Sequence, residues 1–152
     1  MNKQKHNRFM AIVAFLLVVT LMLPSNVFAA VPETIEPQAS AYLTSYTAYV
    51  CSIGSGVLQI WFRVTGTGDM ENIGTLRILL YESTDNSNWY WVDTFRHTDY
   101  PNMLSHNDSH HMSFVEYQGI AGRYYKALVT IWSGGDTEGD ARYMWTPVER
   151  AG

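Results

Sequence analysis

Residues 122–132 run Gly122-Arg123-Tyr124-Tyr125-Lys126-Ala127-Leu128-Val129-Thr130-Ile131-Trp132. The odd positions from Tyr125 to Ile131 are apolar or aromatic, whereas Lys126 and Thr130 bring polarity to the even positions. Because side chains alternate between the two faces of a strand, this pattern predicts a strand with one face in a core. Its β-branched and aromatic residues favour a strand over a helix.

A glycine corner precedes this strand. Gly119 and Gly122 bracket it, and glycine adopts a positive φ without steric cost. A corner that leads a tyrosine into a central strand resembles the tyrosine corner of immunoglobulin-like sandwiches, in which the phenol anchors the turn behind it. We therefore expect Tyr125 to be buried, with its hydroxyl bonded to the backbone of residues 117–121.

Six more strands are predicted, separated by segments rich in Gly, Asn, Asp and Ser: 42–53, 57–65, 75–82, 89–95, 111–117 and 141–146. We expect two alternating sets of side chains to point inward: Leu58, Ile60, Phe62 and Val64, and Leu76, Ile78 and Leu80. Residues 66–69 are expected to end one strand, and Arg96–Ser109 to form a long polar loop. Seven strands at this spacing predict an all-β fold, an immunoglobulin-like antiparallel β-sandwich, with a closed barrel as the alternative.

The start of the chain predicts export. Lys3, Lys5 and Arg8 precede an apolar run from Phe9 to Leu23, and the small-x-small pattern of Val27-Phe28-Ala29 completes the features of a secretory signal peptide. We therefore expect residues 1–29 to be a signal peptide, 30–40 a flexible linker, and 41–150 a single domain of a secreted, extracellular protein.

The charge balance excludes some partners. The chain has ten Lys plus Arg residues against fourteen Asp plus Glu residues. Cleavage after Ala29 removes three of the cations and none of the acids, which leaves a formal charge of −7. An acidic chain without a basic cluster is a poor partner for nucleic acid and for anionic membrane surfaces.

Cys51 is the only cysteine, so no disulfide forms within the chain. An intermolecular bridge or a reactive thiol is an alternative, but we expect a buried, inert cysteine on a strand, because free cysteine is among the most buried residue types.

Several stretches resemble a family of small secreted proteins of Gram-positive bacteria that is catalogued as a domain of unknown function. They are Thr47-Ala48-Tyr49, residues 60–68, Ile73-Gly74, residues 117–125 and Gly139-Asp140-Ala141-Arg142. The resemblance covers essentially the whole mature domain. It implies a secreted, β-rich single domain and assigns no catalytic or binding residue.

Two polar segments contain residue types that bind metals. In the segment His97–His111, the alternate positions His106, Asp108 and His110 suit Zn²⁺ or Cu²⁺ if the chain is extended, and a solvated loop is the alternative. In the second, Asp136, Glu138 and Asp140 offer oxygens to Ca²⁺, but their spacing does not match an EF-hand loop. We predict neither a metal nor a cofactor.

Catalytic motifs are missing from the sequence. It contains no Gly-x-Ser-x-Gly elbow and no His-Glu-x-x-His pattern, and Asp93 and Glu116 form a carboxylate pair only if the fold brings them together. We therefore predict a noncatalytic protein, with a small secreted hydrolase as an alternative.

Surplus aromatic residues are the strongest functional signal. Tyr81, Tyr124 and Trp132 fall on outward positions of predicted strands, where rings stack on sugars, although aromatic residues also serve as ordinary cross-strand contacts. Lys126 and Arg77 have the same parity and offer hydrogen-bond donors beside the rings. We therefore predict a noncatalytic extracellular module that binds glycan or protein through Tyr81, Tyr124 and Trp132. The alternative is a self-associating surface protein, such as a homodimer, which buries an outward patch of Leu79, Tyr81, Leu128 and Trp132.

Overall fold

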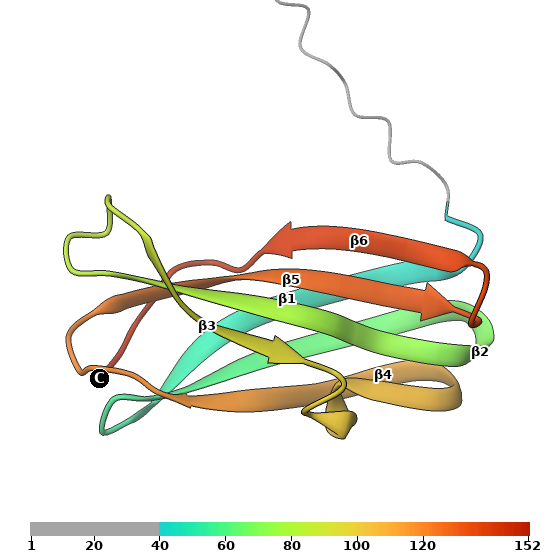
Figure 1. Cartoon of the computed structure of the whole chain (residues 1–152), viewed down its shortest axis with the longest axis horizontal. Coiled ribbons are helices and arrows are strands. Elements are labelled where there is room, and N and C mark those ends of the chain that lie inside the picture. Colours follow the sequence, from blue (N-terminus) through green and yellow to red (C-terminus); the bar gives the residue numbers. More distant parts are fainter. Residues whose placement is uncertain (1–39) are drawn as a thin grey trace, which may run out of the picture. The chain divides into compact units, whose positions relative to one another are not determined.

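The computed structural model describes residues 40–152 and shows an all-β domain (Figure 1). The predicted signal peptide and linker residues 30–39 lie outside the described residues. Seven antiparallel strands form one sheet, with a short 3-10 helix, η1. Their bounds are β1 Leu43–Gly54, β2 Val57–Ser83, β3 Tyr90–Arg96, η1 Pro101–Met103, β4 Leu104–Gln118, β5 Tyr124–Gly134, β6 Gly139–Trp145 and β7 Glu149–Arg150. Within residues 40–152, no helix is long and apolar enough to cross a membrane.

The centre of the sheet is β2, which spans 27 residues and pairs with four other strands. Its first half lies between β1 and β4, and its second half lies between β3 and β5. The predicted break at 66–69 is instead a bend within one strand, marked by a register shift between Thr65 and Met70. The prediction of two separate strands, 57–65 and 75–82, was wrong because β4 bends alongside β2 and maintains its pairing on both sides.

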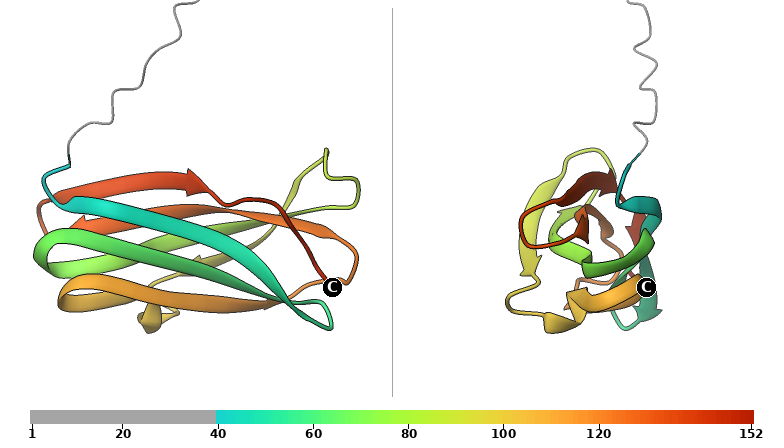
Figure 2. Two further views of the ribbon diagram at one scale, coloured as in Figure 1. Left: turned by 180° about the vertical axis from the view of Figure 1, so that it is seen from behind. Right: turned by 90° about the vertical axis from the view of Figure 1, so that its right-hand side faces the viewer.

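These bends curl the sheet on itself (Figure 2). One side of the resulting half-barrel contains β1, the first half of β2 and the second half of β4, and the opposite side contains β3, the second half of β2, β5 and β6. The two sides of the curled sheet are called layers below. Strands that pass from one layer to the other at a bend are the usual way of turning such a corner.

The core lies between the layers and follows the predicted alternation. Leu58, Ile60, Phe62 and Val64 are buried on β2, and Tyr125, Ala127, Val129 and Ile131 are fully buried on β5. The second predicted set is correct for Ile78 and Leu80 but wrong for Leu76. A register shift between Thr75 and Arg77 turns Leu76 outward, and Thr75 is fully buried in its place.

The tyrosine corner is confirmed. Tyr125 is fully buried, and its hydroxyl accepts a 2.9 Å hydrogen bond from the backbone N–H of Ile120. The same hydroxyl donates to the carboxylate of Glu82 at 3.1 Å, and Glu82 also forms an ion pair with Arg123. Burial of the phenol raises the pKa of Tyr125. Gly119 has no room for a side chain, because a Cβ there would lie 2.9 Å from the Tyr125 ring.

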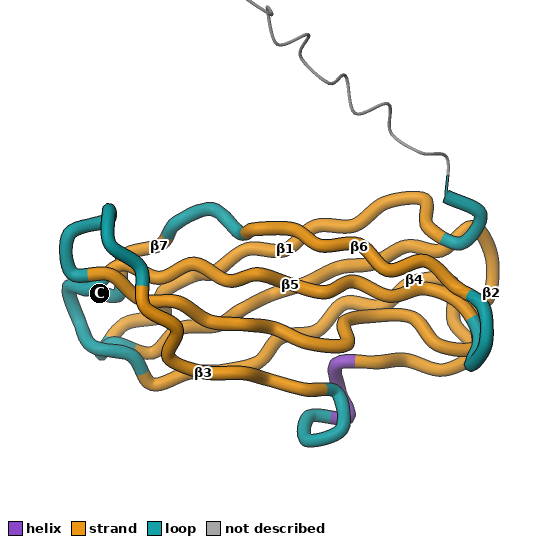
Figure 3. Tube along the Cα trace, turned by 45° about the horizontal axis from the view of Figure 1, so that its top comes forward, coloured by secondary structure: helices purple, strands orange, loops and turns teal. Residues whose placement is uncertain are grey.

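The last residues of the chain close one end of the domain (Figure 3). β7 pairs with the start of β5, and Ala151 is buried. The backbone N–H of Gly152 donates to Ser52 Oγ at 2.9 Å, and Gly56 donates its N–H to the Gly152 carbonyl at 2.7 Å. These contacts fasten the final segment to the β1–β2 hairpin.

Two further expectations were wrong. The segment expected as a polar loop, Arg96–Ser109, contains η1 and the start of β4, because residues from Leu104 pair with β2. Cys51 does lie on a strand, but it is only partly buried, since it pairs with Gln59 on the outward side of β1.

Candidate functional site

Tyr81 and Lys126 occupy directly paired positions on β2 and β5. Their chain neighbours Leu80, Tyr125 and Ala127 are fully buried, so Tyr81 and Lys126 project from the opposite, outward side of the sheet. This outward side of β3, β2, β5 and β6 is called the β5 face below.

Two tryptophans bracket the Lys126 ammonium. Lys126 Nζ lies 4.2 Å from the ring centroid of Trp89 and 4.8 Å from that of Trp145, both within the range of cation–π attraction. The Tyr81 ring lies 5.3 Å from the Trp145 ring, centroid to centroid. We call Tyr81, Trp89, Lys126 and Trp145 the Lys126 cluster.

Other exposed rings extend the cluster across the sheet. Trp91 of β3 is paired with Tyr81, and its indole N–H donates to the Asp93 carbonyl at 2.9 Å, which fixes the ring. Trp91 is 62% exposed, Trp145 49% and Tyr143 65%, so large ring surfaces are open to solvent. Rings held in this way need little ordering when a ligand arrives.

The structure places the three predicted site residues on one face but not at one spot. Tyr81 belongs to the Lys126 cluster, and Tyr124 lies on the same face with the Arg150 guanidinium over its ring, 5.6 Å from the centroid. Trp132 is paired with Gly74, at the far end of β5 from Tyr124. It is half-buried there and lines a hollow of about 370 Å³ together with Leu76, His97 and His106.

Sequence reasoning did not identify the three tryptophans of the cluster region, Trp89, Trp91 and Trp145. The spacing of Trp145 in the last long strand predicts an outward position only once its pairing with Leu128 is known. Trp89 precedes β3, and a bulge between Leu80 and Tyr81 alters the register of β3. Cross-strand register was therefore the missing information.

The three residues considered as a metal site, His106, Asp108 and His110, are not brought together. Asn107 adopts a left-handed backbone conformation, with φ 52°, where β4 bends, and this interrupts the expected alternation. His110 Nδ1 lies 3.5 Å from Asp108 Oδ1, whereas His106 lines the separate hollow beside Trp132. Among residues 40–152, no group of three His, Cys, Asp or Glu side chains is placed to hold a metal ion.

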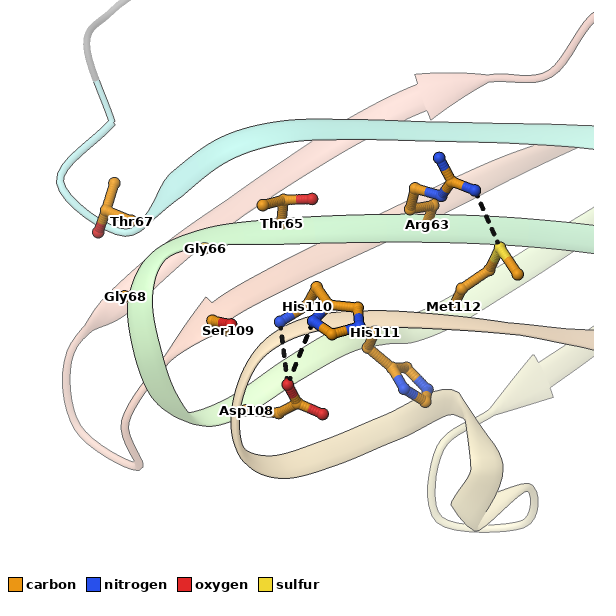
Figure 4. A pocket seen from close by; sticks show the side chains of 10 residues that line it. All are labelled: Arg63, Thr65, Gly66, Thr67, Gly68, Asp108, Ser109, His110, His111 and Met112. Atoms are coloured by element: carbon orange, nitrogen blue, oxygen red, sulfur yellow. Dashed lines mark hydrogen bonds and ion pairs between the residues drawn. The ribbon is translucent and has the colours of Figure 1, made fainter.

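Asp108 and His110 line an open hollow of about 820 Å³ at the bends of β2 and β4 (Figure 4). The backbone N–H of His110 holds the pKa of Asp108 below its usual value. The Arg63 guanidinium donates to the Met112 sulfur at 3.4 Å, and His111 Nε2 lies 2.8 Å from the Asn102 carbonyl oxygen. No hydroxyl of this lining bonds to either histidine among the described contacts, so the hollow presents no nucleophile paired with a base.

The acidic loop does not present its carboxylates to one point. Asp136 accepts a 3.0 Å hydrogen bond from Asn72, Glu138 accepts one from the Tyr42 hydroxyl, and Asp140 accepts one from Ser40. The hydrogen bond from Ser40 is the main reason that the pKa of Asp140 is lowered. Each acid therefore has its own protein donor, as expected of a loop that satisfies its own polar groups.

The suggested carboxylate pair is also separated. Asp93 lies on β3 and accepts a hydrogen bond from the backbone N–H of Thr94. Glu116 lies on β4 in the other layer and accepts a hydrogen bond from the side chain of Gln59. The two do not form a general acid–base pair in this fold.

The outward side of the other layer carries a ladder of rings. Tyr49, Trp61 and Phe114 stand directly opposite one another on β1, β2 and β4. Tyr49 and Trp61 are stacked with an interplanar angle of 10°, and the Trp61 and Phe114 centroids lie 4.6 Å apart. Because these rings cover one another's faces, they act mainly as cross-strand contacts.

No protein-family model, curated protein or solved structure matches this chain.

Proposed function

We propose that this protein is a secreted, noncatalytic binding module that holds a glycan on the β5 face. The observation that carries the proposal is the Lys126 cluster, in which an ammonium group lies between two tryptophan rings and beside Tyr81. Secretion rests on the signal-peptide pattern of residues 1–29.

The cluster offers the two features that a sugar ring requires. The exposed faces of Trp91, Trp145 and Tyr143 supply apolar surface for the CH groups of a sugar. Lys126, which forms no ion pair among the described residues, supplies N–H donors to the hydroxyl oxygens. A rigid sheet presents both without rearrangement, so binding loses little conformational entropy.

The immunoglobulin-like sandwich remains our proposal for the architecture. The tyrosine corner and the presence of two layers around one core support it. The resemblance to the family of small secreted Gram-positive proteins is likewise proposed, and it rests on the sequence stretches given above.

A glycan array followed by calorimetry tests the function. We expect the wild-type protein to bind at least one glycan class, and Tyr81→Ala and Trp145→Ala to weaken that binding by about tenfold or more, as loss of a stacking ring predicts. Tyr49→Ala, on the other layer, is the matched control and should bind like wild type. Equal binding by all variants would place the site elsewhere, and an empty array would reject the glycan proposal.

Self-association is the second candidate. The β5 face also exposes Trp91, Tyr143 and Trp145, and a contiguous apolar patch of this kind is typical of protein interfaces. Light scattering across a concentration series distinguishes the two, because a homodimer that buries this face would dissociate in the Trp145→Ala variant. A wild-type monomer at all concentrations would exclude self-association.

A further inference from the structure

The outward strand positions of the β5 face carry cations and no carboxylate, although the mature chain is predicted to be acidic overall. Strand register and the buried alternate positions assign Arg96 of β3, Arg77 of β2 and Lys126 of β5 to the outward side. The remaining outward positions on these strands and on β6 are uncharged: they are aromatic or aliphatic residues, threonine, serine or glycine. Asp136, in the loop after β5, borders this face at the hollow beside Trp132, where Asn72 donates a hydrogen bond to it. The strand positions themselves therefore carry positive charge only.

Arg77 and Arg96 occupy directly opposite positions on paired strands. Like charges in such positions repel each other, and an anion between them would relieve the repulsion. Neither side chain has an ion pair or a side-chain hydrogen bond within the described part of the chain. The ion pairs there join other residues: His110 with Asp108, Arg123 with Glu82, and Arg142 with Asp140.

Lys126 completes the pattern. Its ammonium is held by the rings of Trp89 and Trp145, with no carboxylate partner among the residues described. The rings fix its position but leave its charge uncompensated, so an incoming anion meets a cation that is already in place.

We propose that the glycan held on this face is acidic, carrying carboxylate or sulfate groups. This inference rests on the proposed function and adds the charge class of the ligand. Arg77 and Arg96 together receive one acidic group, because planar guanidinium groups match the oxygens of carboxylate and sulfate. The Lys126 cluster stacks on another sugar of the same chain.

The spacing requires an oligosaccharide. Arg77 and Tyr81 are separated by four positions on β2, which corresponds to about 13 Å along a strand. A single sugar that stacks on the cluster does not reach the arginines. A nucleic-acid strand also combines bases with anionic groups, so oligothymidylate is the competing ligand in the test below.

Calorimetry on the purified protein tests the inference with matched probes. The acidic probes are oligogalacturonate, which bears carboxylates, and dextran sulfate. Their neutral counterparts are fully methyl-esterified oligogalacturonate and dextran, and oligothymidylate represents nucleic acid. We expect at least one acidic probe to bind about tenfold or more tightly than its neutral counterpart, with affinity that falls as salt rises. Binding of only one acidic probe supports the inference and identifies the acidic group.

The double variant Arg77→Gln/Arg96→Gln should lose this preference while retaining the melting temperature, because it removes a repulsive pair from the surface. Arg63→Gln, on the other layer, is the matched control and should keep the preference. Neutral probes that bind as tightly as acidic ones would overturn the acidic ligand and leave the glycan module intact. No binding of any sugar probe would overturn the acidic ligand, and it would overturn the glycan module as well if the glycan array is also empty. Tighter binding of oligothymidylate would replace the glycan by nucleic acid.

Discussion

The backbone N–H of Ile120 donates a 2.9 Å hydrogen bond to the hydroxyl of Tyr125, which lies five residues further along the chain. This bond fastens the corner between β4 and β5 to a fully buried ring. It also determines the point at which β5 enters the core, and therefore which side chains of β5 lie on the outward face.

Tyr125→Phe should lower the free energy of unfolding by about 1–3 kcal/mol, because the Ile120 N–H loses its acceptor and Glu82 loses a donor. Chemical denaturation measures the change. Tyr117→Phe is the control, since no hydrogen bond of its hydroxyl is found among the described contacts, and its effect should stay within about 0.5 kcal/mol. Equal effects of the two substitutions would contradict the anchoring role.

Thr75→Val should stabilise the domain. The hydroxyl of Thr75 is buried without a hydrogen-bond partner, and replacing it with a methyl group removes an unsatisfied polar atom, which contributes about 1 kcal/mol. Thr146→Val is the matched opposite case. The Thr146 hydroxyl accepts a 2.9 Å hydrogen bond from the Ala127 N–H, so removal of this hydroxyl should destabilise the domain. Thermal unfolding of both variants tests the signs. A lower melting temperature for Thr75→Val would indicate an unseen partner.

Asp85 should make the stability of the domain depend on acid pH. Its carboxylate accepts hydrogen bonds from the backbone N–H groups of Ser87 and Asn88 and from two side chains, and these hold its pKa well below the usual range. A depressed folded-state pKa means that this stabilisation is complete above the unfolded carboxyl pKa, near ~3.9, and is lost as the pH falls through the folded value.

Denaturation at several pH values measures this effect. Asp85→Asn should be less stable than wild type at neutral pH, and the difference should shrink as the pH drops below about 4. Asp69→Asn, which changes an exposed aspartate in the β2 bend, is the control and should stay within about 0.5 kcal/mol of wild type. A constant difference across the pH range would exclude this linkage.

Chelator and reductant together should leave the melting temperature unchanged. Among the described residues no three candidate ligands converge, and Cys51 is the only cysteine of the chain. A large decrease with chelator alone would instead support a structural metal, because its binding contributes directly to folding. A decrease with reductant alone would reveal an intermolecular bridge through Cys51.

Local patterns in the sequence predicted much of the fold. The alternation in β5, the buried set from Leu58 to Val64 and the tyrosine corner all depend on neighbouring residues, so the sequence alone was sufficient for them. The bend of β2 was not predictable in this way. Residues 66–69 are of types that favour turns. They remain within one strand only because β4 bends alongside β2.

The candidate site was predictable only in part. Parity placed Tyr81 and Lys126 on the outward side, and the pairing of β2 with β5 brings the two residues together. The separation of Trp132 from Tyr81, and the approach of Trp89 and Trp145 to Lys126, depend on register and on a bulge in β3 pairing. These relationships join residues that are distant in the chain, so no local pattern encodes them.

The shared strand β2 has a consequence for how the chain folds. β1 and β3 are close to it in sequence, whereas β4 and β5 are distant: Val57 pairs with Gln118 and Asn72 pairs with Gly134. Such non-local pairing predicts slow folding, on a scale of about milliseconds to seconds. Before β4 and β5 pair with β2, the edges of β2 are unpaired and can form hydrogen bonds with β5 of another copy of the chain. During refolding at high concentration, exchange of β5 between copies is therefore the misfolding route that this topology favours.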